Sequence, residues 1–511
     1  MPHRTLAEQK HKFGPVIWLR VGARNTMVIQ SAKAAANLFK NHDISLAGRP
    51  TTEASQVYDY HKGSLALAPY GSHWRVLRRL VTVDMLVNKR INETGFVRKK
   101  CLEILQLWIE EEASKLKEGH GVHVARFVFL MSFNLLGNLM LSKDLVDPNS
   151  KEGSDNDWND GVRWLDPQGL KRKMTRDLGK ALKIAARFVR QRMKDKQLGG
   201  VRTRDFLDAT GDEPAKISGH DVNIFILEIF LACSETTSST IEWALTELLC
   251  NPEKLIKAKA ELTQVIGPSC RKVEEGDIEK LPYLQGIIKE TLRLYPPIPF
   301  LIPRKAMEET KFMDYFIPKN TLNPDVWDDE PALFKPERFI GTKWDCKGQH
   351  FEFIPFGSGR RVCAGLPLAH RMLHLTLGMF LHQFDWELGG DVTRGNIDWK
   401  DKLGITMRKS EPSLNTWSNG RVEFSCMFYH LLFTSSALLD PPEIIEIGSP
   451  SASSGPKGWP VLGNMLDLGT MPHRTLTDLG HKFGPVIWLT LGVRNIVNSI
   501  CQGSCRPFQE P

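Results

Sequence analysis

The segment FIPFGSGRRVCAG, residues 353–365, carries the residue pattern with the clearest chemical content. It places Cys363 just before an apolar run that has helical spacing and begins at Leu366. At such a loop-to-helix junction, the helix dipole and free backbone N–H groups favour a thiolate. Glycines let the backbone approach the sulfur closely. The pattern predicts a metal-binding thiolate, and the plainer alternative is a buried free cysteine on a glycine-rich turn.

A second candidate group interrupts the apolar run 222–250 with the residues Ala232-Cys233-Ser234-Glu235-Thr236-Thr237. An acid beside an alcohol inside an apolar helix is hard to explain by packing alone. The Thr236 hydroxyl can bond the helix backbone and hold water, while the Glu235 carboxyl relays protons. The pair predicts proton delivery to a reacting group. The alternative is a helix with polar residues here that carry no function.

Two further pairs place a cation beside a partner on one helical face. Trp74 and Arg78, in PYGSHWRVLRRL, are four residues apart and could together bind a carboxylate. The alternative for them is an amphipathic basic helix. Glu290 and Arg293, in LPYLQGIIKETLRLY, are three residues apart and predict an ion pair within one helix. A surface ion pair is the common reading of that spacing.

Helices must position most of these residues. The sequence predicts helices over 222–250, 281–295 and 366–384, of which the first ends at Asn251-Pro252 and the second at Pro296-Pro297. Short apolar runs within 15–30 predict two strands around a turn. We therefore expect a mainly α protein with a small β portion.

Composition restricts the class of protein without naming it. The 511 residues are 41% apolar and 25% charged, as in ordinary globular proteins, and can form a core large enough to hold a cofactor. The net charge of +8 suits a mildly basic surface facing an acidic partner or an anionic membrane, and no nucleic-acid-binding motif accompanies it. The nine cysteines lack CxxC pairs or regular spacing, so we expect neither zinc nor a disulfide framework and infer a reducing compartment.

The cysteine segment fits the pattern Phe-x-x-Gly-x-Arg-x-Cys-x-Gly, and the chain resembles the cytochromes P450 from about residue 12 to residue 409. The other motifs follow in that family's order, including Glu290-x-x-Arg293 and Pro336-Glu337-Arg338-Phe339. The resemblance is strongest to plant enzymes similar to geraniol 8-hydroxylase. It implies the P450 fold, a large helical domain with a small β portion.

The resemblance also implies roles for individual residues. Cys363 would be the axial thiolate of haem (iron protoporphyrin IX), in a loop that also contains Phe356 and Gly365. The haem propionates would be bound by Trp74, Arg78, Arg304 and Arg361. Glu290, Arg293 and Arg338 would form a structural network behind the cysteine loop. The catalytic pair would be Glu235 and Thr236, and the substrate pocket would be lined by Ala232, Pro297, Phe300 and Leu301.

Members of this family insert one oxygen atom from O2 into a substrate, here a small lipophilic, terpenoid-like molecule. The resemblance implies that the protein receives electrons from NADPH through NADPH–cytochrome P450 reductase. It also implies that the protein lies on the cytosolic face of the endoplasmic reticulum membrane. Two alternatives stay open. One is a haem-thiolate isomerase or dehydratase, which the Glu235–Thr236 pair argues against, and the other is a non-catalytic remnant of the family.

The chain departs from the family pattern in several places. Cys233 stands where the family has glycine, so a side chain occupies the part of the helix that leaves room for O2 and substrate. The chain is short near 150–163, 206–213 and 318–327, which predicts deletions in the fold. The polar, basic N-terminus predicts neither a signal peptide nor an N-terminal membrane anchor.

An internal repeat determines the expected domain organisation. Residues 1–25 return at 471–495 with 18 of the 25 positions identical. This predicts an incomplete P450 domain over 1–409, a linker over 410–470, and the start of a second copy over 471–511. Within the linker, the apolar run 424–439 is either a loosely packed segment or a clipped membrane anchor, and a Pro-rich hinge follows it. A fused transcript or a faulty gene prediction would explain the arrangement.

Overall fold

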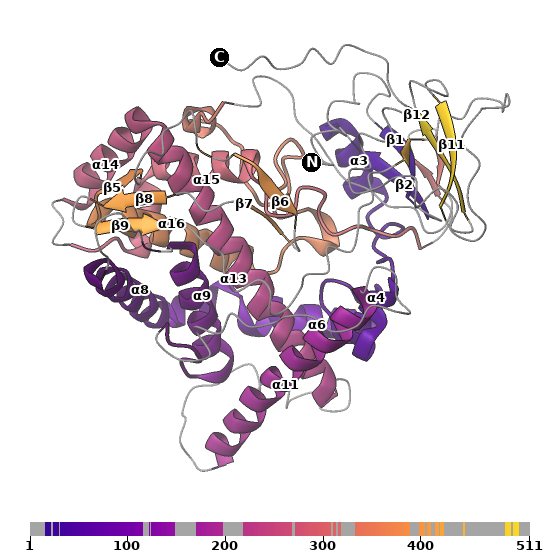
Figure 1. Ribbon diagram of the computed structural model, residues 1–511, viewed down its shortest axis with the longest axis horizontal. Coiled ribbons are helices and arrows are strands. Elements are labelled where there is room, and N and C mark those ends of the chain that lie inside the picture. Colours follow the sequence, from indigo (N-terminus) through magenta and orange to yellow (C-terminus); the bar gives the residue numbers. More distant parts are fainter. Residues whose placement is uncertain are drawn as a thin grey trace.

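The computed structural model describes most of the chain up to residue 423 and three short segments beyond it (Figure 1). The described residues are 16–21, 24–29, 31–115, 122, 124–148, 170–197, 218–267, 271–307, 310–312, 315–317, 333–388, 397, 399–403, 406–409, 414–417, 420–423, 443–444, 486–491 and 494–499. The segments where deletions were predicted, and the apolar run 424–439, lie outside these residues.

Helices make up most of the described structure, as the sequence predicts. They are α3 (Ala32–Asn41), α4 (Glu53–Gln56), α5 (Tyr60–Gly63), α6 (Ser72–Arg79), α7 (Asn88–Glu93), α8 (Gly95–Lys115), α9 (Val124–Leu141), α11 (Leu170–Gln197), α13 (Gly219–Cys250), α14 (Pro252–Ile266), α15 (Pro282–Leu294) and α16 (Leu366–Gln383). Short 3-10 turns lie at Val57–Asp59, Glu275–Lys280, Pro336–Phe339 and Gly359–Arg361, and a π-helical stretch lies at Leu80–Met85.

The strands form small antiparallel sheets. They are β1 (Val16–Val21), β2 (Arg24–Ile29), β3 (Thr310–Phe312), β4 (Tyr315–Ile317), β5 (Trp386–Leu388), β6 (Asp401–Leu403), β7 (Met407–Lys409), β8 (Leu414–Trp417), β9 (Gly420–Glu423), β10 (Glu443–Ile444), β11 (Val486–Leu491) and β12 (Arg494–Ser499). The sheet orders are β10-β1-β2 and β5-β8-β9, and the other three pairs are β3-β4, β6-β7 and β11-β12. The strands predicted within 15–30 are therefore confirmed as β1 and β2.

The long helix α13 runs through the middle of the molecule (Figure 1). It begins with a capping box, in which Ser218 and Asp221 each bond the other's backbone N–H, and it ends at Asn251, just before Pro252 starts α14. Most of its residues are buried on every side, as expected for a helix in the core of a large domain. The three predicted helices correspond to α13, α15 and α16.

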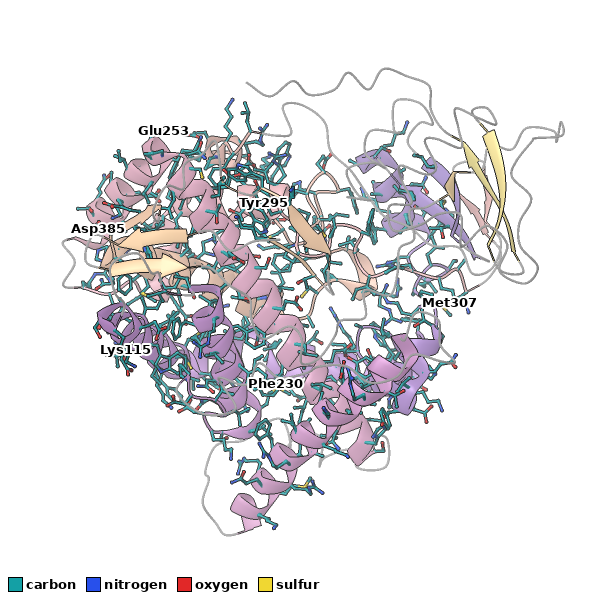
Figure 2. All side chains as sticks on the ribbon, viewed as in Figure 1. Lys115, Phe230, Glu253, Tyr295, Met307 and Asp385 are labelled. Atoms are coloured by element: carbon teal, nitrogen blue, oxygen red, sulfur yellow. The ribbon has the colours of Figure 1, made fainter. Side chains whose placement is uncertain are left out.

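The main core is built where α13 meets α9, α15 and α16, and α8 packs on α9 and α16. Figure 2 shows Phe230 of α13 inside this core, where its ring lies 4.5 Å from that of Phe133 on α9. Farther along α13, Trp243 stacks on Tyr295 at 3.9 Å. Two of these helices, α9 and α13, are long and apolar enough to cross a membrane, but 78% of each apolar window is buried inside the protein. They are therefore core helices of this domain.

The sheet β5-β8-β9 crosses the domain boundary that the sequence predicts at residue 409. Strand β8 pairs with β5 through Trp386↔Trp417, and β9 pairs with β8 through Leu414↔Glu423. Strand β5 follows α16 directly, so residues 414–423 complete a sheet of the main domain. We therefore propose that the domain ends after Glu423 and that the linker begins there.

The repeated segment near the C-terminus forms the same local structure as its counterpart. Strands β11 and β12 pair from Val486↔Ser499 to Leu491↔Arg494. Strands β1 and β2 pair from Val16↔Ile29 to Val21↔Arg24, with the same register after an offset of 470 residues. The repeat in sequence is thus a repeat of a β-hairpin.

Candidate functional site

The cysteine segment forms a tight loop that leads into α16. The Cys363 N–H donates to the Phe356 carbonyl over 2.9 Å, which closes the loop. Gly357 and Gly359 have φ angles of 72° and 66°, in the left-handed region that side chains disfavour. A Cβ at Gly359 would also collide with the Asp43 carboxylate. The two glycines are therefore required by the loop, which brings Cys363 to the start of α16.

The Cys363 thiol faces a cavity, although protein surrounds it otherwise. Burial raises the pKa of the thiol, and backbone N–H groups of Gly365 and Leu366, together with the charge of Arg78, act in the opposite direction. These two N–H groups are the unpaired donors of the first turn of α16. The loop thus places a sulfur at the cavity with two backbone N–H groups beside it, which partly oppose the effect of burial on its pKa.

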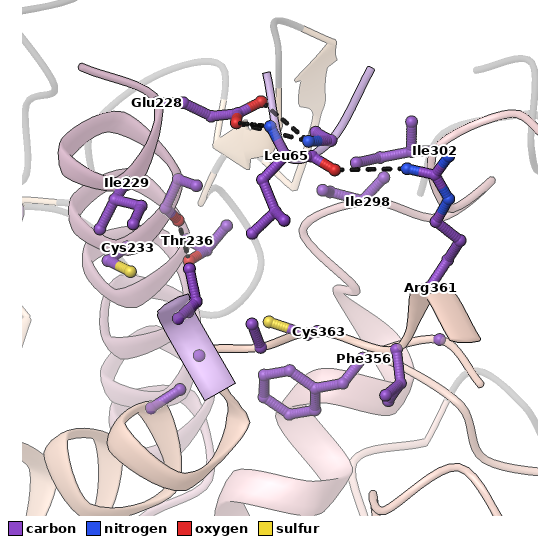
Figure 3. Close-up of a pocket in the computed structure, with 18 of the residues that line it drawn as sticks. Leu65, Glu228, Ile229, Cys233, Thr236, Ile298, Ile302, Phe356, Arg361 and Cys363 are labelled. Atoms are coloured by element: carbon purple, nitrogen blue, oxygen red, sulfur yellow. Dashed lines mark hydrogen bonds between the residues drawn. The ribbon is translucent and has the colours of Figure 1, made fainter. Parts of the chain in front are cut away.

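The cavity has a volume of about 260 Å³ and lies between α13 and the cysteine loop (Figure 3). Its far walls are apolar and come from α9, the π-helical stretch and α16, through residues such as Val81, Leu86, Leu135, Leu136 and Met372. Four arginines line another part of it. The cavity therefore has an apolar body and a cationic side, with Cys363 between them.

Arg361 lies at the centre of the cationic side. Its guanidinium donates to the backbone carbonyls of Ala47, Leu65 and Ala68 and lies 4.2 Å from the Trp74 ring. Burial lowers the pKa of Arg361 to about 10, and the nearby charges of Arg304 and Arg78 act in the same direction. Like charges this close stabilise an anion placed among them.

Arg304 is buried and has a carboxylate partner outside the cavity. It donates to Asp43 over 2.7 Å and to the Ser358 carbonyl over 2.9 Å. Arg360 binds the same carboxylate over 2.8 Å. Burial would raise the pKa of Asp43, but the hydrogen bonds from the two arginines lower it below its ordinary value. Asp43 therefore stays ionised and fixes Arg304 at the edge of the cavity.

Trp74 and Arg78 both reach the cavity from α6, as their spacing predicts. The Trp74 indole N–H donates to the Leu65 carbonyl over 2.9 Å, and Arg78 donates to the Val362 carbonyl over 2.7 Å. Arg78 is thus bonded to the residue that precedes Cys363. The amphipathic-helix alternative does not account for two inward-facing polar side chains.

Two charged residues of the site were not predicted from the sequence. Arg49 is buried, lines the cavity, and donates to the carbonyls of Ala66, Ile302 and Pro303. Glu228 lies on α13, one turn before Ala232, and accepts hydrogen bonds from the segment that begins at Ser64. Glu228 could have been predicted from the sequence, because it is an acidic residue four positions before Ala232 in an otherwise apolar helix. The sequence around Arg49 offered no comparable pattern.

The polar interruption of α13 reaches the cavity in part. Ala232, Cys233 and Thr236 line it, and the Thr236 hydroxyl donates to the Ala232 carbonyl over 2.6 Å. Glu235 is buried but lies outside the cavity lining. Burial and the neighbouring Cys363 raise the pKa of Cys233 to about 12, so this second thiol is neutral. The structure thus brings Thr236, and not Glu235, to the cavity wall.

The predicted substrate-pocket residues after α15 are separated by a turn. Pro297 and Leu301 line the cavity together with Ile298, whereas Phe300 lies outside the lining. The turn is closed by the Leu301 N–H, which donates to the Ile298 carbonyl, and Leu301 itself has a φ of 52°. This turn places Leu301 in the cavity wall and leaves Phe300 out of it, which the linear sequence does not reveal.

Glu290, Arg293 and Arg338 come together where α15 meets the 3-10 turn Pro336–Phe339. Glu290 is fully buried and binds Arg293 through two hydrogen bonds of 2.7 and 2.9 Å. The backbone N–H of Lys335 donates to the same carboxylate. Arg338 approaches it only to 3.6 Å, and its Nε and Nη2 atoms have no hydrogen-bond partner within the described structure. The surface ion-pair alternative is excluded, because Glu290 and Arg293 are buried.

The donor set of the cavity fits a haem group. Cys363 offers a sulfur flanked by N–H groups, and the cavity lining also contains the N–H donors of Trp74, Arg49, Arg78, Arg304 and Arg361, which suit two carboxylates. The remaining walls are apolar, as the body of a porphyrin requires. A Cβ at Gly365 would lie 3.7 Å from both Cys363 and Cys233 sulfurs, so a larger residue there would narrow the space above the thiol.

Comparison with known proteins gives the same result. The model of the family described as Cytochrome P450 matches residues 1–415. Cytochrome P450 76A2 of Solanum melongena is 48% identical over 80% of this chain and 88% of its own length. Iridoid oxidase of Catharanthus roseus is 45% identical over 83% of this chain and 89% of its own length. Geraniol 8-hydroxylase of Swertia mussotii is 38% identical, covering 80% and 88%.

Solved structures agree in fold. A zebrafish cytochrome P450 determined with abiraterone superposes with a TM-score of 0.65 at 21% identity, over 83% of this chain and 98% of its own. Another zebrafish structure, with progesterone, gives a TM-score of 0.66 at 22% identity. A cysteine loop at the start of α16, a cavity beneath α13 and this agreement in sequence and fold lead to one conclusion: the chain belongs to the cytochrome P450 family, the haem-thiolate monooxygenases.

Proposed function

We propose that this protein inserts one oxygen atom from O2 into a small lipophilic, terpenoid-like substrate. The names of two relatives, iridoid oxidase and geraniol 8-hydroxylase, support the substrate class. The apolar residues Ala232, Pro297 and Leu301 in the cavity wall support a lipophilic molecule. The observation that carries the proposal is the Cys363 sulfur facing that cavity, with four arginines beside it.

Cys363 would bind the iron of haem through its sulfur, and the thiolate-ligated haem would supply the activation of O2. The Gly365 and Leu366 N–H groups oppose the effect of burial on the Cys363 pKa and would limit the charge of an iron-bound thiolate. Trp74, Arg78, Arg304 and Arg361, together with Arg49, would hold the two propionates, in exchange for some of the backbone carbonyls that they contact here. Asp43 would keep Arg304 in place through its hydrogen bond of 2.7 Å.

The substrate would lie between α13 and the turn after α15. The side chain of Ala232 is small and leaves room for a substrate. Pro297, Ile298 and Leu301 form an apolar surface opposite Ala232. Such surfaces bind a lipophilic molecule by excluding water and orient it by shape. Cys233 reduces the space beside Ala232, which favours a slender substrate.

Thr236 would deliver protons to the reacting oxygen. Its hydroxyl donates to the Ala232 carbonyl, and a rotation about χ1 would turn the same hydroxyl toward the cavity. Glu235, the next residue, would replace the proton from outside the cavity lining, through water. A hydroxyl at this wall supports monooxygenation over the isomerase or dehydratase alternative, which needs no proton delivery to oxygen.

Electrons would come from NADPH through NADPH–cytochrome P450 reductase. We also propose that the protein works on the cytosolic face of the endoplasmic reticulum membrane. The resemblance to plant P450 enzymes supports both proposals. The free cysteines Cys101, Cys233, Cys250, Cys346 and Cys363 are compatible with that reducing side of the membrane.

The absorption spectrum of the reduced, CO-bound protein tests the proposal. The expressed full-length chain should show the Soret band of thiolate-ligated haem, and Cys363→Ser should abolish it. Cys233→Ser is the matched control, because it removes the other cavity thiol and should keep the band. A thiolate-type band that survives in Cys363→Ser would overturn the ligand assignment. A wild-type chain without haem would establish the non-catalytic remnant.

A further inference from the structure

Two of the described cysteines share the cavity and come from elements that are distant in the sequence. Cys363 lies in the loop before α16, and Cys233 lies on α13. Both side chains line the cavity, and Figure 3 shows their sulfurs turned toward each other across it. Neither sulfur is part of a disulfide. The cavity therefore contains a pair of thiols and not the Cys363 thiol alone.

Gly365 limits the distance between the two sulfurs. A Cβ at Gly365 would lie 3.7 Å from the Cys233 sulfur and 3.7 Å from the Cys363 sulfur. Apart from Gly365 and its chain neighbours, no other described residue has an atom within 4 Å of that point. A disulfide requires the two sulfurs to be about 2 Å apart. Rotation of the two side chains, with a small approach of the loop to α13, would bring the sulfurs to that distance.

The remaining described cysteines are placed differently. Cys101, Cys250 and Cys346 are buried, and none of them lines the cavity. An oxidant small enough to enter the cavity would therefore reach Cys363 and Cys233 first. Cys363 is the more exposed of these two, so its thiol would react before that of Cys233. Oxidation of a thiol stays reversible when a second, resolving thiol lies beside it.

We infer that Cys233 is a resolving cysteine for Cys363, and that hydrogen peroxide joins the two thiols in a disulfide while the chain holds no haem. The pair is thus a modification site inside the cavity. The inference rests on the proposed function in one respect, because it takes Cys363 as the cysteine that binds haem iron. The disulfide itself forms without haem.

The oxidation proceeds in two balanced steps. In the first, the Cys363 sulfur attacks one oxygen of hydrogen peroxide, and the O–O bond breaks. The sulfur becomes a sulfenic acid, and the thiol proton leaves with the other oxygen as water. In the second, the Cys233 sulfur attacks the Cys363 sulfur, the S–O bond breaks, and the released hydroxyl takes the Cys233 proton to form a second water. The two sulfurs lose two electrons, which reduce the peroxide to water.

The disulfide and haem exclude one another. A Cys363 sulfur bonded to Cys233 cannot bind iron as a thiolate, and haem bound in the cavity would keep the two sulfurs apart. Thiol reductants break a disulfide, but they do not reduce sulfinic acid, to which an unprotected sulfenic acid is oxidised next. Cys233 would therefore preserve the haem-binding sulfur of a chain that meets peroxide before it binds haem.

Peptide mapping by mass spectrometry under non-reducing conditions tests the disulfide directly. The full-length chain, expressed without a haem precursor, is treated with an equimolar amount of hydrogen peroxide. We expect the peptide that contains Cys233 to be linked to the peptide that contains Cys363. Cys250→Ser is the matched control, because it removes another cysteine of α13 and should keep the link. The haem-loaded chain should stay unlinked.

Recovery of haem binding provides a second readout. Haem-free wild-type protein and Cys233→Ser are each treated with excess peroxide, then with dithiothreitol, and then with haemin. The wild-type chain should regain the CO-bound spectrum of its untreated sample. Cys233→Ser should regain about fivefold less of its own untreated band, because Cys363 proceeds to sulfinic acid without a resolving thiol.

The possible results separate the inference from the proposed function. A treated wild-type chain with no link between Cys233 and Cys363 would overturn the inference, and so would equal recovery of the two proteins. If the link forms but the untreated wild-type chain never binds haem, the inference is supported and the proposed function is contradicted. A link that also forms in the haem-loaded chain would support the thiol pair and contradict Cys363 as the iron ligand.

Discussion

The buried ion pair at Glu290 allows a quantitative comparison between two arginines. Arg293→Ala and Arg338→Ala each remove one cation from Glu290, whose side chain is fully buried. Arg293 is 4% exposed and makes two hydrogen bonds with Glu290. Arg338 is 20% exposed, approaches only to 3.6 Å and makes no hydrogen bond through Nε or Nη2 within the described structure. We therefore expect the two substitutions to differ in cost.

The magnitudes follow from burial and geometry. Removing Arg293 leaves a buried carboxylate without its main partner, which costs about 3–5 kcal/mol of unfolding free energy. Glu290 retains the Lys335 N–H, so a value near the lower end is expected. Removing Arg338 breaks a longer, partly exposed contact and should cost about 1 kcal/mol. The expected difference of about 2 kcal/mol or more is well above the error of denaturant titrations.

Urea unfolding of the wild-type protein and both variants measures this difference, and the CO-bound spectrum reports haem content in the same samples. Arg90→Ala is a suitable control, because it breaks an ion pair with Glu93 that is 3.5 Å long and largely exposed. It should change the unfolding free energy by about 0.5 kcal/mol or less. An Arg338→Ala variant as unstable as Arg293→Ala would refute this reasoning. The burial and hydrogen bonds of each arginine would then not determine how much its contact with Glu290 contributes to the unfolding free energy.

Three further predictions concern other parts of the chain. Burial lowers the pKa of His374 from 6.5 to about 3, so the unfolded chain takes up a proton on this imidazole at a higher pH than the folded chain. The free energy of unfolding should therefore fall by up to about 1.4 kcal/mol for each pH unit below 6.5. Unfolding measured at several pH values should show a smaller fall in His374→Gln. Thr236→Ala should still consume NADPH but release hydrogen peroxide in place of product, with Thr236→Ser restoring coupling; unchanged product yield would reduce Thr236 to a packing role. Truncation after Glu423 should preserve the melting temperature and haem content, whereas truncation after Lys409 should lower the melting temperature because it removes β8 and β9.

The helices and the cysteine loop could be predicted from sequence because their signals are local. The capping residues of α13, the proline after it and the glycines before Cys363 each act within a few residues of the structure that they determine. The pairs Trp74–Arg78 and Glu290–Arg293 were equally accessible, since helical spacing places them on one face. Local patterns thus pointed to Cys363 and to several residues that line the same cavity.

The parts that escaped prediction depend on contacts between distant segments. Arg49 reaches Ile302 and Pro303, more than 250 residues away, and Glu228 meets Ser64 across 164 positions. Arg49 contacts backbone carbonyls, and Glu228 contacts the backbone N–H groups of Leu65 and Ala66 in addition to the Ser64 hydroxyl. Backbone partners carry no side-chain signature. The separation of Leu301 from Phe300 at the cavity depends on one left-handed residue, which sequence patterns would assign to glycine. Sequence reasoning identified the chemical groups but not the backbone that holds them.

The repeated hairpin shows why similar sequence and register do not make two segments interchangeable. Val28 and Ile29 of β2 are 2% and 0% exposed, and Ile29 belongs to the small core formed with α3. The equivalent positions of β12, after the offset of 470 residues, are Asn498 and Ser499. Burying an unpaired polar side chain costs about 1–3 kcal/mol each, in addition to the lost apolar contacts. Exchange of the second hairpin for the first is therefore unfavourable by several kcal/mol, which leaves β1 and β2 as the strands of the working domain.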